Sequence, residues 1–239
     1  VVLAFLPAVE RPLGGHEVSG AEHAAAEQER LRDERRRAVW SIVRSARLWL
    51  YGASYFFIKL IRYALLFWLP YYLSDRFGFT TRDAAWLSTA FDAGGVVGVV
   101  VLGRLSDRVP ARGRSTWALV SLVGLVLALV LYVVFGGSGT LQNVFWLALL
   151  GALLFGPDAL LSGPAAQDAG GVLTPALATG FVNGLGSCGA LAQGLVVPAL
   201  AARYGWSGLF PAFVVFALCA ALALVPTLRV ASAGAPEPH

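Results

Sequence analysis

The chain has 239 residues, of which 57% are hydrophobic and 13% are charged, and its formal net charge is +4. Soluble domains carry about 25% charged residues, so this composition argues for a membrane protein and, with no catalytic constellation in the sequence, against an enzyme. The basic residues lie mainly at the borders of hydrophobic segments, which argues against a nucleic-acid partner. No motif indicates a metal ion or a cofactor.

The first nine residues form a short apolar stretch that runs into Glu10 and Arg11. They lack the positively charged start of a signal peptide, and the chain contains no methionine, even at position 1. We therefore expect residues 1–9 to be the end of a preceding transmembrane helix. We also expect the chain to be a fragment whose N-terminal part is missing.

Residues 10–47 form a long hydrophilic segment. Residues 21–38 within it are rich in Ala, Glu and Arg, with pairs such as Glu27 and Arg30 on one helical face. This composition favours a surface helix. We expect residues 10–47 to be a polar loop that carries this helix.

Six hydrophobic segments of membrane-spanning length follow. A bilayer core of about 30 Å is crossed by about 20 helical residues, and the segments lie at residues 48–73, 84–103, 115–135, 141–161, 176–200 and 206–228. The sequence therefore predicts an all-α membrane protein with a six-helix bundle over residues 48–228. Residues 229–239 are rich in Pro and Ala, and we expect them to be a disordered tail.

The distribution of basic residues predicts the orientation of the bundle. Residues 10–47 and 104–114 are rich in Arg, whereas the connections on the opposite side are poorer in basic residues. The positive-inside rule then places residues 10–47, 104–114, 162–175 and the C-terminus in the cytoplasm. The connection at 162–175 itself has no Lys or Arg, so it adds nothing to this assignment.

Lys59 and Arg62 lie near the centre of the first hydrophobic segment. Each cation costs at least about 2.5–3.5 kcal/mol at that depth. Because they are three residues apart they share one helical face, where they need an anion, a counter-ion or a water-filled cavity. A carrier of anions would supply all three.

Arg62 is the stronger candidate for an anion ligand. Its guanidinium binds phosphate oxygens bidentately and keeps its proton, whereas Lys59 can deprotonate when no anion is bound. The alternative for Arg62 is an internal salt bridge with Asp92 or Asp158. Both roles can hold in different conformational states.

The other polar residues within the hydrophobic segments each have two possible roles. Asp92 fits a counter-ion within the bundle or a proton-coupling group. Asp158 follows Pro157, so it fits either a cavity wall or a group that satisfies a helix kink. Asn183 and Tyr63 are candidates for contact with substrate, although helix–helix hydrogen bonding and packing explain such residues equally well. The same alternatives apply to Ser187 and Gln193.

Two glycine pairs, Gly94–Gly98 and Gly180–Gly184, have the spacing of small-xxx-small motifs. This spacing allows two helices to approach closely in lipid. We expect both pairs to lie at helix–helix contacts.

The connection between the second and third hydrophobic segments carries a motif made of Gly103, Asp107, Arg108, Arg112 and Arg114. It resembles the cytoplasmic loop signature of the major facilitator superfamily, which joins the second and third helices of each six-helix half. The acid is expected to cap a helix end and pair with nearby arginines, latching one conformation. The alternative is a solvated basic loop.

Four segments in the bundle are similar to the organophosphate:phosphate antiporters of that superfamily. Residues 61–73, 91–98, 156–163 and 178–187 resemble their seventh, eighth, tenth and eleventh helices. The resemblance implies that the bundle is the C-terminal half of a twelve-helix major facilitator fold, with residues 1–9 the end of its sixth helix.

The resemblance also implies a function. The chain would exchange an organophosphate, such as a sugar phosphate or glycerol-3-phosphate, for inorganic phosphate by alternating access. Arg62 matches the arginine that binds the substrate phosphate, Lys59 stands one turn before it, and Asp92 matches an acid of salt-bridge switching. The partners would be the lipid bilayer, the anionic substrates and the missing N-terminal half, and the location a bacterial inner membrane.

Two alternatives remain open at this point. One is a major facilitator carrier for another organic anion or a drug, with the same arginine bound to a carboxylate. The other is a membrane sensor that binds a sugar phosphate without transporting it.

Overall fold

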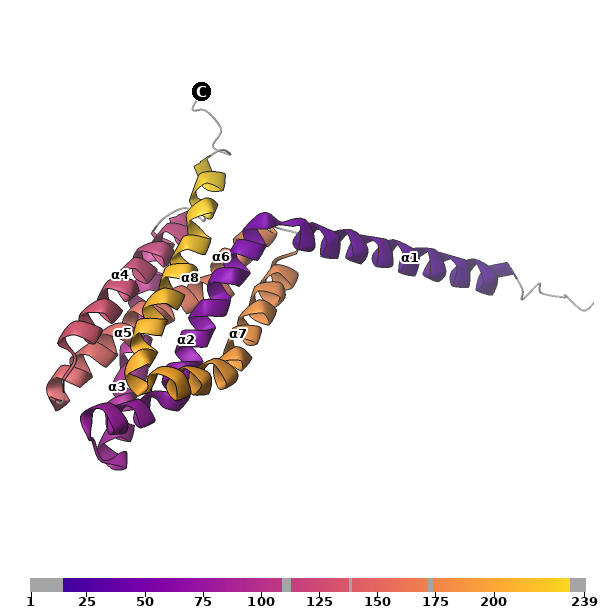
Figure 1. The fold of residues 1–239 in the computed structure, drawn as a ribbon. Helices are drawn as coiled ribbons and strands as arrows, with labels where there is room; N and C mark the ends of the chain where they lie inside the picture. The colour runs from indigo at the N-terminus through magenta and orange to yellow at the C-terminus, as the bar shows by residue number, and fades with distance from the viewer. Residues whose placement is uncertain (1–14, 109–112, 138, 172–173, 233–239) are drawn as a thin grey trace, which may run out of the picture. The chain divides into compact units, whose positions relative to one another are not determined.

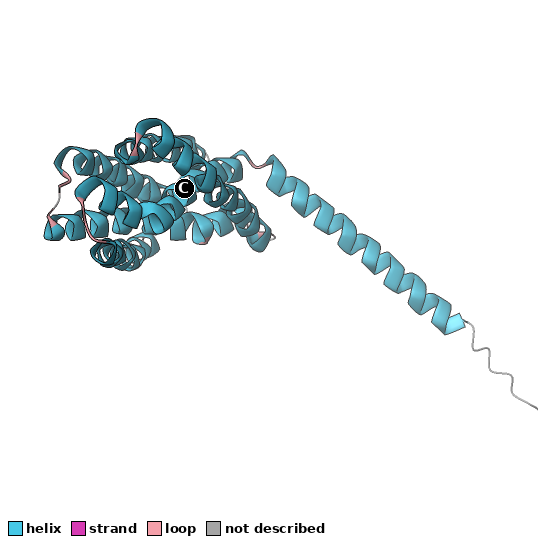
Figure 2. Cartoon of the chain, turned by 60° about the horizontal axis from the view of Figure 1, so that its bottom comes forward, coloured by secondary structure: helices cyan, strands magenta, loops and turns pink. Residues whose placement is uncertain are grey.

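The computed structural model describes residues 15–108, 113–137, 139–171 and 174–232. In these residues the chain is helical and contains no strand (Figure 2). The helices, labelled in Figure 1, are α1 (Gly15–Arg44), α2 (Ala46–Phe77), α3 (Thr81–Asp107), α4 (Arg114–Phe135), α5 (Thr140–Ser162), α6 (Pro164–Gly170), α7 (Pro175–Tyr204) and α8 (Leu209–Ser232). A 3-10 turn, η2 (Trp206–Gly208), precedes α8.

The chain divides into two units, residues 1–41 and 42–239. In its described part the first unit is most of α1, and from residue 27 onward nearly all of its side chains are exposed. The helix is longer than the surface helix expected at residues 21–38. It ends because Ser45 takes an extended conformation and caps α2, accepting a hydrogen bond from the Leu48 amide at 3.4 Å.

The second unit contains the membrane helices. Within the described residues, six helical segments are long and apolar enough to cross a membrane: Ala46–Phe77, Thr81–Asp107, Arg114–Phe135, Thr140–Gly170, Pro175–Tyr204 and Trp206–Leu228. Large apolar side chains such as Leu195 (79% exposed) and Leu222 (66% exposed) point outward, as they do when lipid surrounds a bundle. The prediction of an all-α, six-helix membrane protein is confirmed.

Several helix ends differ from the hydrophobic boundaries, because capping groups and not hydrophobicity decide where a helix stops. α2 continues to Phe77 and ends at Gly78, whose φ of 72° is readily adopted only by glycine. α3 begins after Thr80, whose hydroxyl accepts a hydrogen bond from the Asp83 amide at 3.2 Å.

Two other segments also differ from the boundaries that hydrophobicity predicts. Residues 164–170, expected to be part of a loop, form the short helix α6, in which Pro164 takes the first position that suits proline. α8 continues to Ser232, past the expected boundary at residue 228. The predictions for residues 1–9 and for the end of the tail from residue 233 fall outside the described residues.

Helices distant in sequence form the main contacts of the bundle (Figure 1). α3 packs along α5, α2 packs on α7 and α8, and α4 packs on α5 and α8. α2 therefore lies among several helices, which places its central residues inside the bundle.

The contact between α3 and α5 depends on glycine. A Cβ atom added to Gly94 would overlap the backbone of Ala148, and one added to Gly98 would overlap the backbone of Ala152. Gly151 of α5 lies equally close to the carbonyl of Phe91. The expectation that Gly94–Gly98 forms a close helix contact agrees with this packing.

The expectation for Gly180–Gly184 is wrong for this bundle. Both glycines are exposed, with no atom within 4 Å of an added Cβ. α7 instead approaches α2 through Gly186, beside Tyr55, and Gly189, beside the backbone of Phe56. The face of α7 that packs is set by the position of α2, which glycine spacing alone does not reveal.

A buried polar network joins α4 to the start of α5. Asn143 is fully buried, and its side-chain oxygen accepts a hydrogen bond from the Tyr132 hydroxyl at 2.9 Å. Its amide nitrogen donates to the carbonyls of Gly137 at 2.6 Å and Gly139 at 3.0 Å. The side chain therefore satisfies one hydroxyl of α4 and two carbonyls of the turn between the two helices.

Replacing Asn143 by leucine is expected to lower the stability of the bundle. The Asn143→Leu substitution leaves the buried Tyr132 hydroxyl without its acceptor and the Gly137 carbonyl without its side-chain donor, whereas the Gly139 carbonyl keeps the Asn143 backbone amide. Loss of a partner for a buried polar group costs about 1–3 kcal/mol. Thermal unfolding of the detergent-purified protein should show a clearly lower midpoint. Gln142→Leu serves as the control, because the hydrogen bond that it removes, from the Gln142 side chain to the Phe135 carbonyl, is exposed and water can replace it. Equal midpoints for the two variants would contradict the prediction.

Candidate functional site

Lys59 and Arg62 lie in the middle of α2, at positions where the neighbouring residues of the helix are buried. Ile58 and Ile61, which precede them, are fully buried, whereas Lys59 and Arg62 are half-buried. The two cations thus emerge from a packed helix on a side where the bundle is partly open. They come together at mid-length of the helix, as the sequence predicts.

Arg62 is held by two residues of α5. Its Nη1 donates to Asp158 in a short ion pair, and its guanidinium carbon lies 4.0 Å from the centre of the Phe155 ring. Phe155 and Asp158 are three residues apart, so one face of α5 presents both groups. The Arg62 side chain is 31% exposed and that of Asp158 is 9% exposed. The arginine therefore reaches from the open side of the bundle toward a buried carboxylate.

Lys59 has a different environment. Its ammonium lies 5.3 Å from the ring centre of Tyr55 and 5.2 Å from that of Tyr63, which is the range of a cation–π contact. No carboxylate within the described part of the chain is close enough to form a salt bridge with it. Lys59 shares one face of α2 with Arg62, and Arg62 is paired with Asp158, so the three groups form one cluster between α2 and α5.

Two polar residues of α7 form hydrogen bonds inside the bundle. Asn183 donates to the backbone carbonyls of Ser162 at 3.1 Å and Thr179 at 3.0 Å, so it ties α7 to the end of α5. Gln193 accepts a hydrogen bond from the Trp68 indole at 2.8 Å. These are the helix–helix bonds that the sequence left as the alternative to substrate contact.

The two intramembrane acids of the sequence analysis occupy different environments. Asp158 is the counter-ion of Arg62, whereas Asp92 is exposed on α3. Among the described residues Asp92 forms no salt bridge. Asp92 and Asp158 were the two possible salt-bridge partners of Arg62, and in this conformation the partner is Asp158.

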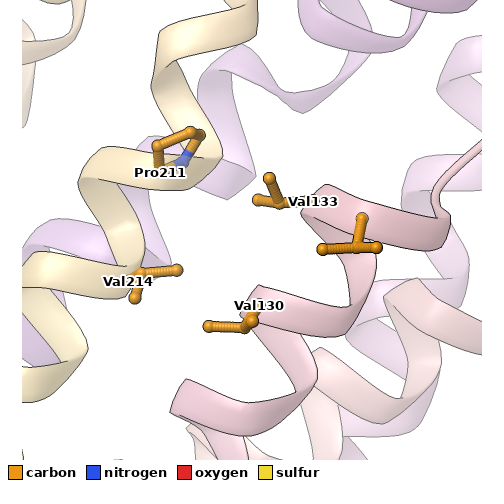
Figure 3. A pocket seen from close by; sticks show the side chains of 5 residues that line it. Val130, Val133, Pro211 and Val214 are labelled. Carbon is orange, nitrogen blue, oxygen red and sulfur yellow. The ribbon is translucent and has the colours of Figure 1, made fainter.

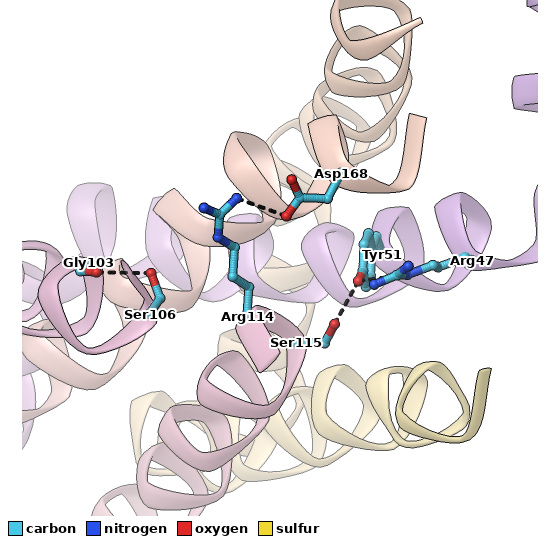
Figure 4. Close-up of polar contacts among 7 residues, drawn as sticks. All are labelled: Arg47, Tyr51, Gly103, Ser106, Arg114, Ser115 and Asp168. Carbon is cyan, nitrogen blue, oxygen red and sulfur yellow. Dashed lines mark hydrogen bonds and ion pairs between the residues drawn. The ribbon is translucent and has the colours of Figure 1, made fainter. Parts of the chain in front are cut away.

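The loop motif connects the end of α3 to the start of α4, and Figure 4 shows two of its residues, Gly103 and Arg114. Gly103 accepts a hydrogen bond from the Ser106 hydroxyl at 2.9 Å, and Asp107 and Arg108 are exposed at the end of α3. Arg112 lies outside the described residues.

In the described part of the chain, Arg114 is the residue of this motif that forms an ion pair. Its Nη1 donates to Asp168 of α6 at 2.8 Å (Figure 4). Asp107, the expected partner of the arginines, has no such contact there. The contact shows that the start of α4 and the helix α6 meet at one end of the bundle.

Sequence reasoning missed a second network at this end. Arg47 donates to the Tyr51 hydroxyl at 3.0 Å, and that hydroxyl lies 2.7 Å from the Ser115 hydroxyl (Figure 4). The network joins the start of α2 to the start of α4. Tyr51 lies in a hydrophobic segment, where the sequence predicts an ordinary packing residue. The sequence around it therefore does not indicate that its hydroxyl forms a hydrogen bond.

An apolar groove between α4 and α8 offers no place for an anion (Figure 3). Its walls contain only hydrophobic side chains, which are Val130, Val133, Val134, Pro211 and Val214. In the described residues, no three His, Cys, Asp or Glu side chains gather as they would around a metal ion. The cluster of Lys59, Arg62 and Asp158 is therefore the candidate site.

Comparison with known proteins agrees with the resemblance seen in the sequence. Residues 1–169 match the family described as the Major Facilitator Superfamily. The chain is 34% identical over 180 residues to a protein of Arabidopsis thaliana whose name describes a glycerol-3-phosphate transporter, covering 71% of this chain and 32% of that protein.

Two animal proteins are similar to the same degree. The Glucose-6-phosphate exchanger SLC37A2 of Bos taurus is 34% identical over 161 residues, covering 64% of this chain and 32% of that protein. Sugar phosphate exchanger 3 of Xenopus laevis is 35% identical over 181 residues, covering 71% of this chain and 34% of that protein. The chain thus spans about one third of the length of the curated relatives it matches.

Proposed function

Because this chain belongs to the Major Facilitator Superfamily, we propose that it is part of a secondary carrier that exchanges an organophosphate for inorganic phosphate. It is an integral membrane protein with six apolar helices, and its relatives are named as transporters and exchangers and not as enzymes. The organic substrate belongs to the class of sugar phosphates and glycerol-3-phosphate that the names of those relatives describe.

The six-helix bundle is the C-terminal half of a twelve-helix carrier. In this arrangement residues 1–9 end the sixth helix, residues 10–47 form the central cytoplasmic loop, and the tail that follows α8 is cytoplasmic. The other half is related to this one by a pseudo-two-fold axis along the membrane normal. The carrier lies in a bacterial inner membrane.

The observation that supports this function is the pair of cations on α2. Lys59 and Arg62 stand together at mid-length of an apolar helix, partly open on one side. Arg62 has one nitrogen on Asp158, and a guanidinium has five N–H donors in all. It can therefore contact a phosphoryl oxygen from the open side. Lys59 adds a second charge, which forms no salt bridge among the described residues, and the opposite half supplies the rest of the clamp.

The same two charges make the carrier an exchanger. When the cavity closes, Lys59, which has no salt bridge among the described residues, is removed from water with its charge, which raises the energy of the empty carrier. A bound dianion neutralises this charge, so the loaded carrier changes conformation more readily than the empty one. Exchange without leak follows from electrostatics, and no covalent chemistry is involved.

The remaining candidate residues take supporting roles. Tyr63 positions Lys59, Asn183 borders the substrate cavity, and Asp92 and Asp158 are charge-switching groups. The motif of Gly103, Asp107, Arg108, Arg112 and Arg114 latches one conformation at the cytoplasmic end. There the pair between Arg114 and Asp168 links α4 to α6.

Uptake into liposomes tests the substrate class. The complete carrier, reconstituted with inorganic phosphate inside, is expected to take up labelled phosphate, whereas liposomes without internal phosphate are not. External glucose 6-phosphate or glycerol-3-phosphate should compete, because each presents the same phosphoryl dianion to Lys59 and Arg62. Competition by carboxylates but not by phosphates would instead identify a carrier for other organic anions. Binding of a sugar phosphate without uptake would identify a sensor.

A further inference from the structure

The later part of α1 carries a surface of mixed basic and apolar side chains. Arg32, Arg35, Arg36, Val39 and Trp40 recur at helical positions i, i+3, i+4, i+7 and i+8, so they lie on one face of the helix. All five side chains are exposed, that of Val39 by 48% and that of Trp40 by 55%. We call this surface the arginine–tryptophan face.

The charge around this face has one sign. Residues 35–47 contain five arginines and neither Asp nor Glu. The nearest acids, Asp33 and Glu34, stand at positions of α1 that the i, i+3, i+4 series skips. The three arginines of the face form no salt bridge with any other described residue. Their guanidinium groups can therefore bind an external anion.

The apolar members of the face distinguish it from an ordinary solvated helix. Tryptophan is enriched at membrane–water interfaces, because its ring is apolar while its N–H group hydrogen-bonds in the headgroup layer. Trp40 stands four residues, about 6 Å of helix axis, before the last residue of α1, Arg44. Two residues further, at Ala46, begins α2, which is long and apolar enough to cross a membrane. Trp40 is therefore close along the chain to a bilayer surface.

The two kinds of side chain together fit an anionic phospholipid. Guanidinium groups bind phosphate oxygens through charge-assisted hydrogen bonds, and the stem of an arginine can lie along apolar surface while its charged end stays in water. Phosphatidylglycerol has a net negative charge, whereas the choline of phosphatidylcholine cancels the charge of its phosphate. Arginine clusters next to a membrane helix accordingly favour anionic headgroups.

We propose that the arginine–tryptophan face of α1 binds the headgroups of anionic phospholipids. The three arginines contact the phosphates, and Val39 and Trp40 insert between the headgroups at the boundary with the acyl chains. The ligand of this segment is thus lipid, and not solvent alone. The inference goes beyond the proposed function and does not depend on which substrate the carrier moves.

Native mass spectrometry of the complete carrier tests this proposal. The protein is mixed in a neutral detergent with equimolar phosphatidylglycerol and phosphatidylcholine, and the dissociation constant of each lipid is measured. The wild type is expected to bind phosphatidylglycerol more tightly. The variant Arg32→Gln/Arg35→Gln/Arg36→Gln should lose this preference, because each arginine near an anionic surface contributes about fivefold and three contribute up to about 100-fold.

A charge-matched control separates a site from diffuse attraction between a cation and an anion. The variant Arg76→Gln/Arg82→Gln/Arg203→Gln removes three exposed arginines from α2, α3 and α7 and should keep the wild-type preference. Trp40→Ala leaves every charge in place and should weaken the binding of phosphatidylglycerol by less than the loss of three arginines does. Glutamine forms helices about as well as arginine, so both triple variants should unfold at the wild-type midpoint in detergent without lipid.

The outcomes decide between a lipid site and other occupants of the face. Equal affinity of the wild type for the two lipids overturns the inference, as does the same loss of preference in both triple variants. Wild-type affinity for phosphatidylglycerol in the Arg32→Gln/Arg35→Gln/Arg36→Gln variant or in Trp40→Ala overturns it too. A lowered unfolding midpoint of that triple variant without lipid would show that the face packs on another part of the carrier. The proposed function is tested separately, by phosphate exchange in liposomes.

Discussion

Replacement of Arg62 by alanine is expected to abolish phosphate exchange by the complete carrier while leaving its insertion into the membrane intact. A charge-assisted hydrogen bond contributes about 1.5–3 kcal/mol. Loss of a bidentate contact therefore reduces phosphate affinity by about 100-fold or more. Counterflow of labelled phosphate in liposomes measures the effect. Counterflow at the wild-type rate would show that Arg62 does not bind the phosphoryl group.

Two controls separate the loss of a ligand from the loss of structure. Arg76→Ala removes an exposed arginine from the last turn of the same helix and should exchange phosphate like wild type. Arg62→Ala also leaves Asp158 buried without its counter-ion, which is destabilising. The double variant Arg62→Ala/Asp158→Asn removes this charge. It should recover thermal stability in detergent but should not recover exchange.

Replacement of Gly98 by valine is expected to prevent α3 and α5 from packing. The added side chain would overlap the backbone of Ala152, and a backbone cannot rotate away as a side chain can. Overpacking of a core usually costs about 1–3 kcal/mol, occasionally more, and the rigid backbone places this site at the upper end. Gly98→Val should give little folded protein or a strongly lowered unfolding midpoint in detergent.

The matched control for this substitution is Val96→Leu. Val96 lies on the same helix two residues away and is 64% exposed, so an added methylene meets no neighbour in the bundle. Its unfolding midpoint should equal that of wild type. Unchanged stability of Gly98→Val would mean that the close contact between α3 and α5 is absent in the membrane.

The candidate site shows how far a sequence can predict a membrane cluster. Lys59 and Arg62 can be identified from the free-energy cost of placing them in the membrane. Two cations in an apolar helix need a partner whatever the fold. The choice between Asp92 and Asp158 as partner of Arg62 stayed open, because each acid lies within a hydrophobic segment. Asp158 faces Arg62 in this conformation because α5 packs beside α2. Phe155 stacks on the same guanidinium. Nothing in the sequence distinguishes it from an ordinary residue of the hydrophobic core.

The loop at the end of α3 is a second case in which the sequence does not predict an ion-pair partner. The motif from Gly103 to Arg114 pointed to a latch, and the acid of the motif was the expected partner. The described ion pair joins Arg114 to Asp168, which lies in α6 beyond two further helices of the chain. A partner that distant in sequence cannot be read from local spacing.

The sequence by itself determined the number of membrane helices, the location of the two central cations and the family resemblance. These depend on the length and hydrophobicity of single segments and on short motifs, which are local properties. Only the tertiary structure decided that Asp158 is the counter-ion of Arg62, and that Gly186 and Gly189 carry the contact of α7. The physical reason is that hydrophobic side chains lie all around each membrane helix, so its sequence does not specify which face meets a neighbour. That face is chosen when all the helices pack together.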